Sequence, residues 1–422
     1  MRSSRAVSEL TVRAITDAEL PAVMGCVLDV FGTDPAVDPQ VLERMRVLVP
    51  VPRTFAAFDG SALVATASAY SLALTVCGGA VVPTGGLTIV TVRPTHRRRG
   101  LLRRLINAHL DDCRARGEAL SGLYASEGGI YGRFGYGVAV ESDELAVVAG
   151  DGLIESDDGA VGGVWPVGLS DDEALATLPA IYAAACAQRP GMYARSLDWW
   201  RWRRIADRPF ARRGRSPRRH VVVRKAGVDR GYVVYRQQLA FEDGRPAGSV
   251  DVEELVALDA DAEAALWRHV TTLDLFPRVS VANAAVDCPL PWLASDYRRV
   301  VRRRRFDTLW LRIDDVTAAL GARRYAADGA VTFVMEGGGW PHDVEPQSRW
   351  RLVVEDGVGT CVPAVGGVDV TLDRATLSSL YLGGVRATAL AQGGRITGKA
   401  EAIAQLDRMF AWPVAPWCAE QF

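Results

Sequence analysis

The sequence predicts a mixed α/β protein of the α+β class with about three domains. Its 422 residues are more than one domain usually holds, since domains of about 150 residues are typical. A plan of strand, helix and strand occurs once in each of the first two thirds, and the last third alternates short strands with small helices. With 49% hydrophobic and 23% charged residues, the composition excludes a disordered chain or a coiled-coil rod.

The charge balance argues against a nucleic-acid-binding protein. The 49 basic and 50 acidic residues give a formal charge of −1, so no overall basic field attracts phosphates. All but two of the basic residues are arginine. We attribute most of this bias to a GC-rich genome, because the forked donors of arginine matter for function only where several meet a phosphate.

Cysteine and histidine spacings indicate neither a disulfide framework nor a metal site. The seven cysteines are odd in number, widely spaced and never form C-x-x-C, and the five histidines show no H-E-x-x-H pattern. The N-terminus lacks the apolar core of a signal peptide, and no apolar run reaches the ~18 residues of a membrane span. We therefore expect a cytoplasmic protein with reduced thiols, no metal and no membrane span.

The first third begins with a helix and continues into strands. Residues 16–19, Thr-Asp-Ala-Glu, form a capping box that predicts a helix to about residue 30. Strands are expected at 53–58 and 63–69, joined by a hairpin at Asp59-Gly60, and again at 74–82 and 87–92. An apolar stripe predicts a helix over 101–116 that Gly117 ends, before a strand at 119–125.

The remaining chain predicts a linker and two further folded regions. Glycine and aspartate are frequent between residues 150 and 168, as in a linker. The helical stretch around Trp199, Trp200 and Trp202 indicates a buried aromatic face with exposed arginines rather than a nucleic-acid site. Strands are expected at 220–223, 231–236, 250–258 and 278–282, with a helix over 261–273, and then at 309–313, 330–335 and 350–354. We place the domains at residues 1–150, 151–300 and 301–422.

The strongest constellation for chemistry is the turn before the helix at 101–116. Residues 97–100 read Arg-Arg-Arg-Gly, and the helix follows at once. Free N–H groups at a helix N-terminus suit a pyrophosphate, Gly100 permits close approach of the backbone, and guanidinium groups add charge-assisted donors. The alternative is a solvated basic turn, but the strand before it and the striped helix after it favour a binding site. The turn is neither a P-loop nor a dinucleotide fingerprint, because both glycine patterns are missing.

A second constellation follows the strand at 119–125. Five glycines lie between Glu127 and Gly137 and indicate a tight loop, in which Tyr131, Phe134 and Tyr136 taken alone suit core packing. Residues 97–102 resemble the acetyl-CoA loop of the GNAT acetyltransferase superfamily, R/Q-x-x-G-x-G/A, with Leu102 in place of its small last residue. Both motifs at this spacing, together with residues 309–313 and 379–383, resemble the Eis (enhanced intracellular survival) acetyltransferase family.

That resemblance implies a fold, an assembly and an activity. It implies an N-terminal GNAT domain with an acetyl-CoA site, a degenerate GNAT-like domain, a sterol-carrier-protein-like α+β domain, and a homohexamer. It also implies acetyl transfer from acetyl-CoA to amines, notably several amines of one aminoglycoside antibiotic, and hence antibiotic resistance. Tyr131 corresponds to the general acid and the C-terminal carboxylate of Phe422 to the general base. The residues expected to bind acetyl-CoA are Val90, Thr91, Val92, Arg97, Arg98, Arg99, Gly100, Leu101, Leu102, Arg103, Ser126 and Glu127.

These two groups suit the chemistry of acetyl transfer. A carboxylate can accept the proton that an amine must lose, and a phenol with a pKa near ~10 can protonate the departing thiolate. Chain ends usually fray, but residues 412–422 are aromatic and contain two prolines, so we expect a docked tail. Whether Glu420 also faces the amine stays open. Phe31 and Asp34 are candidates for the amine pocket, although a packing residue and a turn aspartate explain them equally well.

The second GNAT-like region is expected to lack acetyl-CoA. Its corresponding turn, residues 257–262, has no arginine or glycine, and Asp259 and Asp261 would repel a pyrophosphate. Two other functions remain open at this point. The acceptor could be a protein lysine or a polyamine, or the chain could be a lipid-binding or scaffolding protein, which the intact loop at 97–103 argues against.

Overall fold

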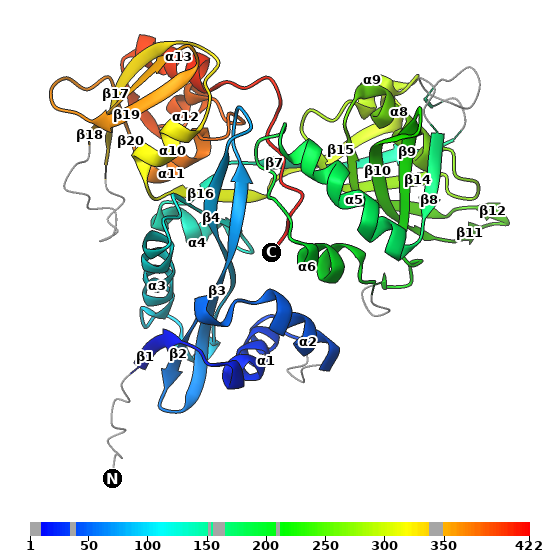
Figure 1. Ribbon diagram of the computed structural model, residues 1–422, viewed down its shortest axis with the longest axis horizontal. Coiled ribbons are helices and arrows are strands. Elements are labelled where there is room, and N and C mark those ends of the chain that lie inside the picture. The colour runs from blue at the N-terminus through cyan, green and yellow to red at the C-terminus, as the bar shows by residue number, and fades with distance from the viewer. Residues whose placement is uncertain (1–9, 34–38, 151–152, 155–164, 208–211, 337–348) are drawn as a thin grey trace. The chain divides into compact units, whose positions relative to one another are not determined.

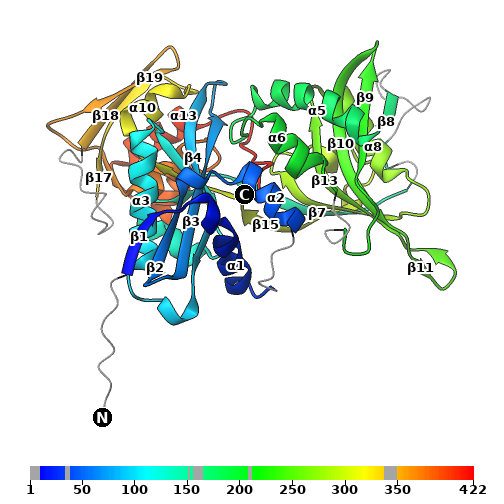
Figure 2. The ribbon, with the colours of Figure 1, turned by 60° about the horizontal axis from the view of Figure 1, so that its bottom comes forward.

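The computed structural model describes residues 10–33, 39–150, 153–154, 165–207, 212–336 and 349–422. The chain divides into two compact units, shown in two orientations in Figures 1 and 2. Unit 1 comprises residues 1–139, 309–412 and 421–422, and unit 2 comprises residues 140–308 and 413–420.

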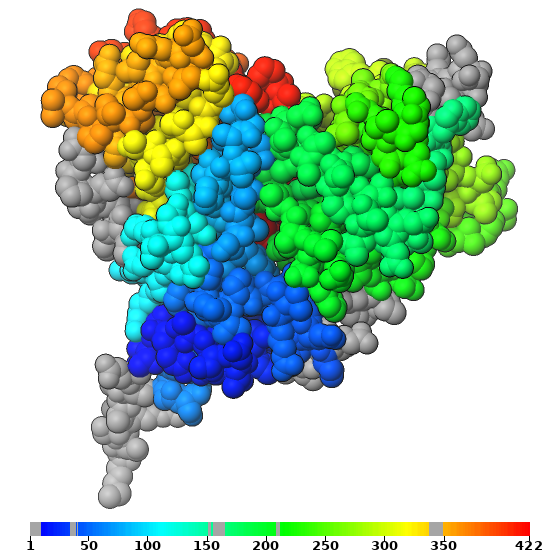
Figure 3. All heavy atoms as spheres, in the orientation of Figure 1, coloured from blue at the N-terminus to red at the C-terminus, as the bar shows by residue number. Residues whose placement is uncertain are grey.

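The first sheet of unit 1 carries the motifs that the sequence singles out. Its strands are β1 (Leu10–Ala14), β2 (Thr54–Asp59), β3 (Ala62–Thr75), β4 (Val81–Val92), β5 (Leu120–Tyr124), β6 (Gly137–Val138) and β16 (Leu309–Ile313), in the order β1-β2-β3-β4-β5-β16-β6. The helices of this part are η1 (Asp17–Glu19), α1 (Leu20–Val30), α2 (Pro39–Leu48), η2 (Val51–Arg53), η3 (Pro94–His96), α3 (Leu101–Ala115), α4 (Gly128–Tyr131) and η4 (Gly132–Phe134). Part of α3 lies at the surface of unit 1 in Figure 3, where it is cyan.

The predicted start of the chain is confirmed with one shift. Glu19 accepts hydrogen bonds from the backbone N–H and the hydroxyl of Thr16, which completes the predicted capping box. The α-helix proper begins at Leu20, because a one-turn 3-10 helix comes first and Pro21 fits the first α-helical turn, where no N–H partner is needed. The hairpin at residues 59–60 is also confirmed.

The predicted strand at 74–82 is wrong. These residues are the end of β3, a turn and the start of β4, which pair as a hairpin from Thr75 and Val81 onward. Gly78 and Gly79 adopt φ values of 89° and 83°, which glycine reaches without steric cost. The apolar run misled the prediction because buried strands flank the turn on both sides.

The second sheet of unit 1 forms the last part of the chain. Its strands are β17 (Gly329–Met335), β18 (Arg349–Glu355), β19 (Val358–Pro363), β20 (Val370–Leu372) and β21 (Ile396–Gly398), in the order β19-β18-β17-β20-β21. Its helices are α10 (Val316–Ala322), α11 (Arg374–Leu380), α12 (Ala387–Gln392) and α13 (Ala400–Phe410). This is the compact α+β region that the sequence predicts, except that β16 does not belong to it.

Strand β16 lies in the first sheet, where it pairs antiparallel with both β5 and β6. Helix α11 packs against β16 and β6, and the backbone N–H of Ile313 donates to Ser378 Oγ at 3.0 Å. Gly137 permits this approach, because a Cβ atom there would lie 1.9 Å from the carbonyl oxygen of Ala375. The first sheet is therefore completed by a strand that follows β6 in the chain only after some 170 residues.

Unit 2 repeats the strand–helix–strand plan that the sequence predicts. Its strands are β7 (Glu141–Val148), β8 (Trp165–Leu169), β9 (Arg219–Lys225), β10 (Val228–Gln238), β11 (Phe241–Glu242), β12 (Arg245–Pro246), β13 (Ser249–Ala257), β14 (Arg278–Ala285) and β15 (Val300–Asp307). Its helices are α5 (Asp171–Cys186), α6 (Leu197–Trp199), the π-helix η5 (Trp200–Ile205), α8 (Ala260–Thr271), α9 (Leu290–Leu293) and η6 (Tyr297–Arg299). The main sheet has the order β15-β7-β14-β13-β10-β9-β8, and α8 connects the parallel strands β13 and β14.

Two details of unit 2 bear on the sequence predictions. Strand β7 precedes residue 150 but lies in this sheet, between β14 and β15. Trp199 and Trp200 are buried, with exposed fractions of 6% and 2%, as predicted. Trp202 is only half-buried, and of the arginines beside it Arg201 is exposed whereas Arg203 and Arg204 are half-buried.

A buried ion network in unit 1 provides a stability prediction. Arg53 is 2% exposed and donates to both carboxylate oxygens of Glu118 at 2.7 Å and to Asp112 at 2.7 Å. Arg53→Met should lower the free energy of unfolding by about 3–5 kcal/mol, because it leaves the Glu118 carboxylate buried without its cation. Urea titration followed by circular dichroism measures the loss. The double variant Arg53→Met/Glu118→Met should recover most of it, and a double variant as unstable as the single one would contradict this account.

Candidate active site

Strands β4 and β5 separate partway along unit 1. They pair in parallel over four residues, from Thr84 opposite Leu120 to Leu87 opposite Leu123. Beyond that point β4 continues to Val92, whereas Tyr124 of β5 pairs with β16. Within the described chain, residues 88–92 therefore have no ladder partner on β5. This opening leaves strand-edge N–H and C=O groups available to an extended ligand.

A bulge lies in the separated part of β4. The register between β3 and β4 shifts between Thr66 and Ser68, so that β4 has one residue more than its partner. Ile89 lies there with φ of 43°, a conformation that a β-branched residue rarely adopts. A bulge bends its strand, so it accounts for the divergence of β4 from β5. The predicted cofactor residues Val90, Thr91 and Val92 directly follow Ile89. Thr91 is buried, and its hydroxyl group forms a 2.6 Å hydrogen bond with that of Thr66.

The arginine-rich turn lies where the sequence predicts it. Gly100 is the N-cap of α3 with φ of +77°, and a Cβ atom there would have no neighbour within 4 Å. Glycine is therefore required for the backbone conformation and not for space. The first regular hydrogen bond of the helix runs from the N–H of Arg104 to the carbonyl of Gly100, so the preceding N–H groups form the positive end of the helix dipole. Four predicted arginines are exposed around this end: Arg97, Arg98, Arg99 and Arg103.

This geometry gives a matched pair of glycine variants. Gly100→Ala should raise the KM for acetyl-CoA about tenfold, because alanine disfavours the φ that orients the turn toward a phosphate. Gly117 ends the same helix with φ of +69°, and a Cβ atom there would likewise have no neighbour within 4 Å. Gly117→Ala should therefore cost similar stability without changing that KM. Steady-state kinetics with both variants tests this, and equal KM values for the two would contradict a role of Gly100 in binding.

Tyr131 lies at the end of α4 and packs into the core beside the opening. It is 9% exposed and belongs to the same hydrophobic cluster as Val90, Val92 and Leu102, which come from β4 and α3. Burial, with a smaller effect of the nearby Glu127 carboxylate, raises the pKa of Tyr131 to about 12. The structure thus brings the predicted general acid together with the end of β4 and the start of α3. Ser126 and Glu127 are exposed in the loop before α4.

The two tyrosines of the glycine-rich loop differ in what their hydroxyl groups contact. Their rings meet edge to face, with centroids 6.1 Å apart. The hydroxyl of Tyr136 lies 2.7 Å from Ser121 Oγ, which in turn lies 2.7 Å from His109 Nε2 in a fully buried network. Among the described residues, the hydroxyl of Tyr131 has no hydrogen-bond partner. It is therefore the phenol that remains available to a substrate.

The chain end is docked, as its composition predicts. The Phe422 ring meets Tyr70 of β3 edge to face at 6.1 Å between centroids. A Cβ atom on Gly86 of β4 would lie 3.2 Å from Phe422 Cε2, so the ring contacts β4 one residue before the last β4–β5 pair. A Cβ atom on Gly85 would instead meet Cys113 of α3. Because successive strand residues face opposite sides, Phe422 lies on the face of β4 that α3 does not cover.

The side-chain carboxylate of Glu420 makes its contacts within unit 2. It is 4% exposed, accepts a hydrogen bond from Trp199 Nε1 at 2.8 Å and forms an ion pair with Arg195. Arg195 also forms an ion pair with Glu254 and stacks over the ring of Tyr182 at 3.7 Å. The side chain of Glu420 thus serves to hold the tail in unit 2, a role that residue type alone did not indicate.

The structure describes one of the two candidates for an amine pocket. Phe31 follows α1 as its C-cap and is 57% exposed, and it is not among the described residues packed around Tyr131. Asp34 lies outside the described residues.

The corresponding turn of unit 2 is built differently. The Asp259 side chain caps α8 by accepting from the N–H of Ala262 at 2.8 Å and forms an ion pair with Arg230. Asp261 forms an ion pair with Lys225. A carboxylate therefore already lies at the helix end where a phosphate would bind, which supports the prediction that this unit does not bind CoA.

The described part of the chain has no candidate metal centre. It contains no group of three or more His, Cys, Asp or Glu side chains placed to hold a metal ion. All of its cysteines are free thiols. None of its helices has the length and apolar character needed to cross a membrane.

Comparison with known proteins places these features in a family. Residues 11–139 and 191–313 each match an acetyltransferase (GNAT) domain, and residues 301–419 match a sterol carrier protein domain. The chain is 36% identical over 406 residues to the N-acetyltransferase Eis of Mycobacterium tuberculosis, which covers 92% of this chain and 93% of that protein. The chain belongs to the Eis N-acetyltransferase family.

Two further relatives agree with this assignment to the Eis family. An uncharacterized N-acetyltransferase of Streptomyces avermitilis is 37% identical over 388 residues, with 90% of this chain and 92% of that protein covered. The crystal structure of Eis1 from Mycobacterium abscessus matches with a TM-score of 0.81 at 30% identity and covers 98% of this chain and all of that one. The predicted resemblance and fold class are confirmed, and the chain is an N-acetyltransferase with two GNAT domains and a sterol-carrier-type domain. GNAT acetyltransferases use acetyl-CoA as donor.

Proposed function

We propose that this enzyme acetylates amines of aminoglycoside antibiotics at more than one position, with Tyr131 as general acid and the terminal carboxylate of Phe422 as general base. The observation that carries the proposal is the position of both groups along β4. The Phe422 ring contacts Gly86, just before β4 and β5 separate, and Tyr131 belongs to the hydrophobic cluster against which Val90 and Val92 pack, just after. We infer that the two groups flank the stretch of strand edge that an acyl donor would occupy.

Acetyl-CoA would lie along the opening between β4 and β5. The edge of residues 88–92 suits the amides of the pantetheine arm, and the first turn of α3 with its exposed arginines suits the pyrophosphate. Ser126 and Glu127 lie beside the opening at the end of β5. Each of these groups would contact a different part of the donor.

The reaction proceeds by direct attack of the amine. The ammonium group of the acceptor gives one proton to the Phe422 carboxylate, and its nitrogen then bonds to the thioester carbon. The nitrogen of the resulting tetrahedral intermediate loses its second proton to solvent, the C–S bond breaks, and the CoA thiolate takes its proton from the hydroxyl of Tyr131. Solvent then restores the proton of Tyr131 and removes the one held by Phe422. The products are the amide, CoA thiol and one released proton, and no covalent enzyme intermediate forms.

A thiol-release assay with an acceptor panel tests the substrate class. The panel contains several aminoglycosides, spermidine and a lysine-containing peptide, each compared by kcat/KM. We expect the aminoglycosides to be preferred by at least tenfold and mass spectrometry to show products with two or more acetyl groups. A preference for spermidine or the peptide would assign the enzyme to polyamines or protein lysines instead.

A further inference from the structure

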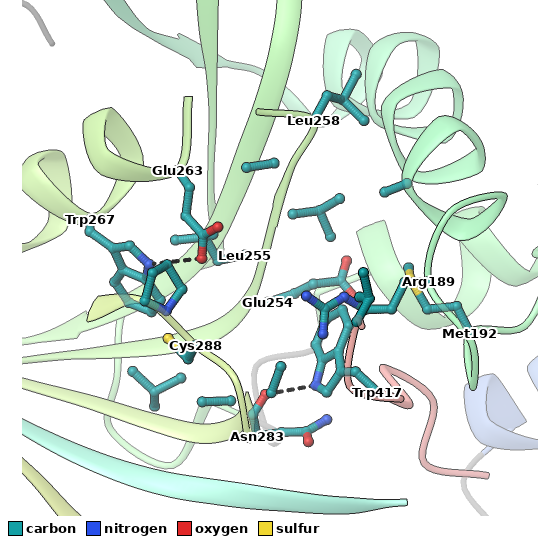
Figure 4. A pocket seen from close by; sticks show the side chains of 18 of the residues that line it. Arg189, Met192, Glu254, Leu255, Leu258, Glu263, Trp267, Asn283, Cys288 and Trp417 are labelled. Atoms are coloured by element: carbon teal, nitrogen blue, oxygen red, sulfur yellow. Dashed lines mark hydrogen bonds between the residues drawn. The ribbon is translucent and has the colours of Figure 1, made fainter. Parts of the chain in front are cut away.

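Unit 2 contains a cavity where its own two parallel strands separate. Strands β13 and β14 pair from Ser249 opposite Arg278 to Val252 opposite Val281. Residues of both strands beyond the last pair line a cavity of about 260 Å³. Figure 4 shows Glu263 and Trp267 of α8 on one side of it and Arg189, Met192 and Trp417 on the other. The cavity therefore occupies the place in unit 2 that the acyl-donor opening occupies in unit 1.

The C-terminal tail forms a fixed wall of this cavity. Trp417 Nε1 donates to the carbonyl of Asn283 at 3.2 Å, and the Asn283 amide donates to the carbonyl of Cys418 at 3.0 Å. The backbone N–H of Trp417 donates to the carbonyl of Pro190 at 2.9 Å. Trp417 is 7% exposed, so the indole is held in place. The site is preformed, as small-molecule sites usually are, and the tail takes up part of the space that a long donor such as CoA would need.

All but one of the charged side chains that line the cavity form ion pairs with other residues of unit 2. Glu253 pairs with Arg218 and Arg236, and Glu254 pairs with Arg195 and Arg204. Arg189, which also lines the cavity, pairs with Asp287.

Glu263 is the exception. Among the described residues, no Lys, Arg or His forms an ion pair with it. Trp267 Nε1 donates to it at a long 3.4 Å. Burial raises the pKa of its carboxyl group, and the Trp267 hydrogen bond and the nearby Arg189 guanidinium offset only part of this rise. A carboxylate in a partly apolar cavity gains most from a cation that enters with its ligand.

The remaining residues that line the cavity suit the apolar part of a ligand that carries such a cation. Leu255, Leu258 and Met192 provide apolar surface, and the indoles of Trp267 and Trp417 provide aromatic surface. A carboxylate beside aromatic rings is a combination that attracts organic ammonium ions, through charge and through cation–π contact. The volume also fits, since a cavity of about 150 Å³ already accepts a benzene ring.

We propose that this cavity is a second ligand site that binds a small organic ammonium ion with an apolar body, and that Glu263 pairs with the ammonium group. The site belongs to unit 2 alone and is separate from the acetyl-transfer site proposed for unit 1. Its charge selects cations over neutral and anionic molecules of the same shape.

Calorimetric titration of the full-length enzyme without an acetyl donor tests the site. The probes are phenethylammonium, the neutral 2-phenylethanol and the anion phenylacetate. We expect phenethylammonium to bind at least tenfold more tightly than 2-phenylethanol, and phenylacetate not to bind. Equal affinity for the cation and the alcohol, or no binding of the cation, would overturn the proposal, and this comparison needs no variant.

Two variants locate the binding. Glu263→Gln should weaken phenethylammonium at least tenfold and leave 2-phenylethanol unchanged, whereas Ala285→Trp should fill the cavity and abolish both. Affinity that survives Glu263→Gln would show that the cation binds elsewhere. Because no acetyl transfer is measured, this outcome is independent of the proposed catalytic function.

Discussion

Replacing Tyr131 with phenylalanine should lower kcat for acetyl transfer about 100-fold and leave the KM for acetyl-CoA within about twofold. The variant removes one hydroxyl group that has no hydrogen-bond partner among the described residues and keeps the ring that packs near Val90 and Val92. General acids typically contribute 10²–10⁴-fold to rate, and a phenol that acts only on the departing thiolate contributes nothing to donor binding. Steady-state kinetics with varied acetyl-CoA separates the two effects.

Tyr136→Phe is the matched control for this variant. It removes a hydroxyl from the same loop, but that hydroxyl belongs to the buried network with Ser121 and His109. We expect a loss of about 1–2 kcal/mol in the free energy of unfolding and a kcat within about threefold of wild type. If both variants lost activity equally, the effect of Tyr131 would be one of packing and not of proton donation.

The raised pKa of Tyr131 also sets the shape of the pH profile. Burial raises this pKa to about 12, so the phenol keeps its proton at every pH well below that value. Because the Phe422 carboxylate accepts the proton of the ammonium form, the wild-type enzyme does not depend on acceptor molecules that arrive deprotonated, so kcat/KM should stay nearly constant between pH 6 and pH 9 and not decline before pH 10. A descending limb near pH 9 that Tyr131→Phe abolishes would show that the pKa of Tyr131 is much lower than its surroundings imply.

Local features of the fold and site could be predicted from the sequence. The capping box at Thr16, the hairpin at Asp59 and the turn at Gly100 each depend on a few neighbouring residues with defined backbone preferences. The turn that we propose to bind acetyl-CoA is such a feature, because a strand end, a glycine and a helix start are all adjacent in the chain. That is why the strongest functional prediction coincides with the most local motif.

Features that depend on distant contacts could not be predicted in this way. Nothing in the five residues of β16 indicates that they pair with β5 and β6 rather than with the strands that follow them. Likewise Tyr131 and Tyr136 are the same residue type in one loop, and only Ser121, from β5, distinguishes their hydroxyl groups. Glu420 is an ordinary carboxylate in the sequence, and its role follows from Arg195, which lies 225 residues earlier.

Converting the terminal carboxylate of Phe422 to a carboxamide should lower kcat at pH 7 at least 100-fold. The change removes the proposed proton acceptor and keeps the phenyl ring that contacts Tyr70 and Gly86. The tail itself should stay docked, because Trp417 and Glu420 hold residues 413–420 within unit 2. Protein ligation can supply the amide, and the same ligation with a native carboxylate is the control. Appending residues after Phe422 should have a similar effect.

The dependence of this loss on pH distinguishes a base from an anchor. If the carboxylate accepts the proton of the amine, the carboxamide enzyme can use only acceptor molecules that arrive already deprotonated. That fraction grows about tenfold for each pH unit below the pKa of the amine, so the deficit should shrink steadily toward pH 9. If Phe422 only orients the site, the ratio of the two kcat values should be the same at every pH. A constant ratio would therefore rule out the terminal carboxylate as general base, even if the loss at pH 7 were large.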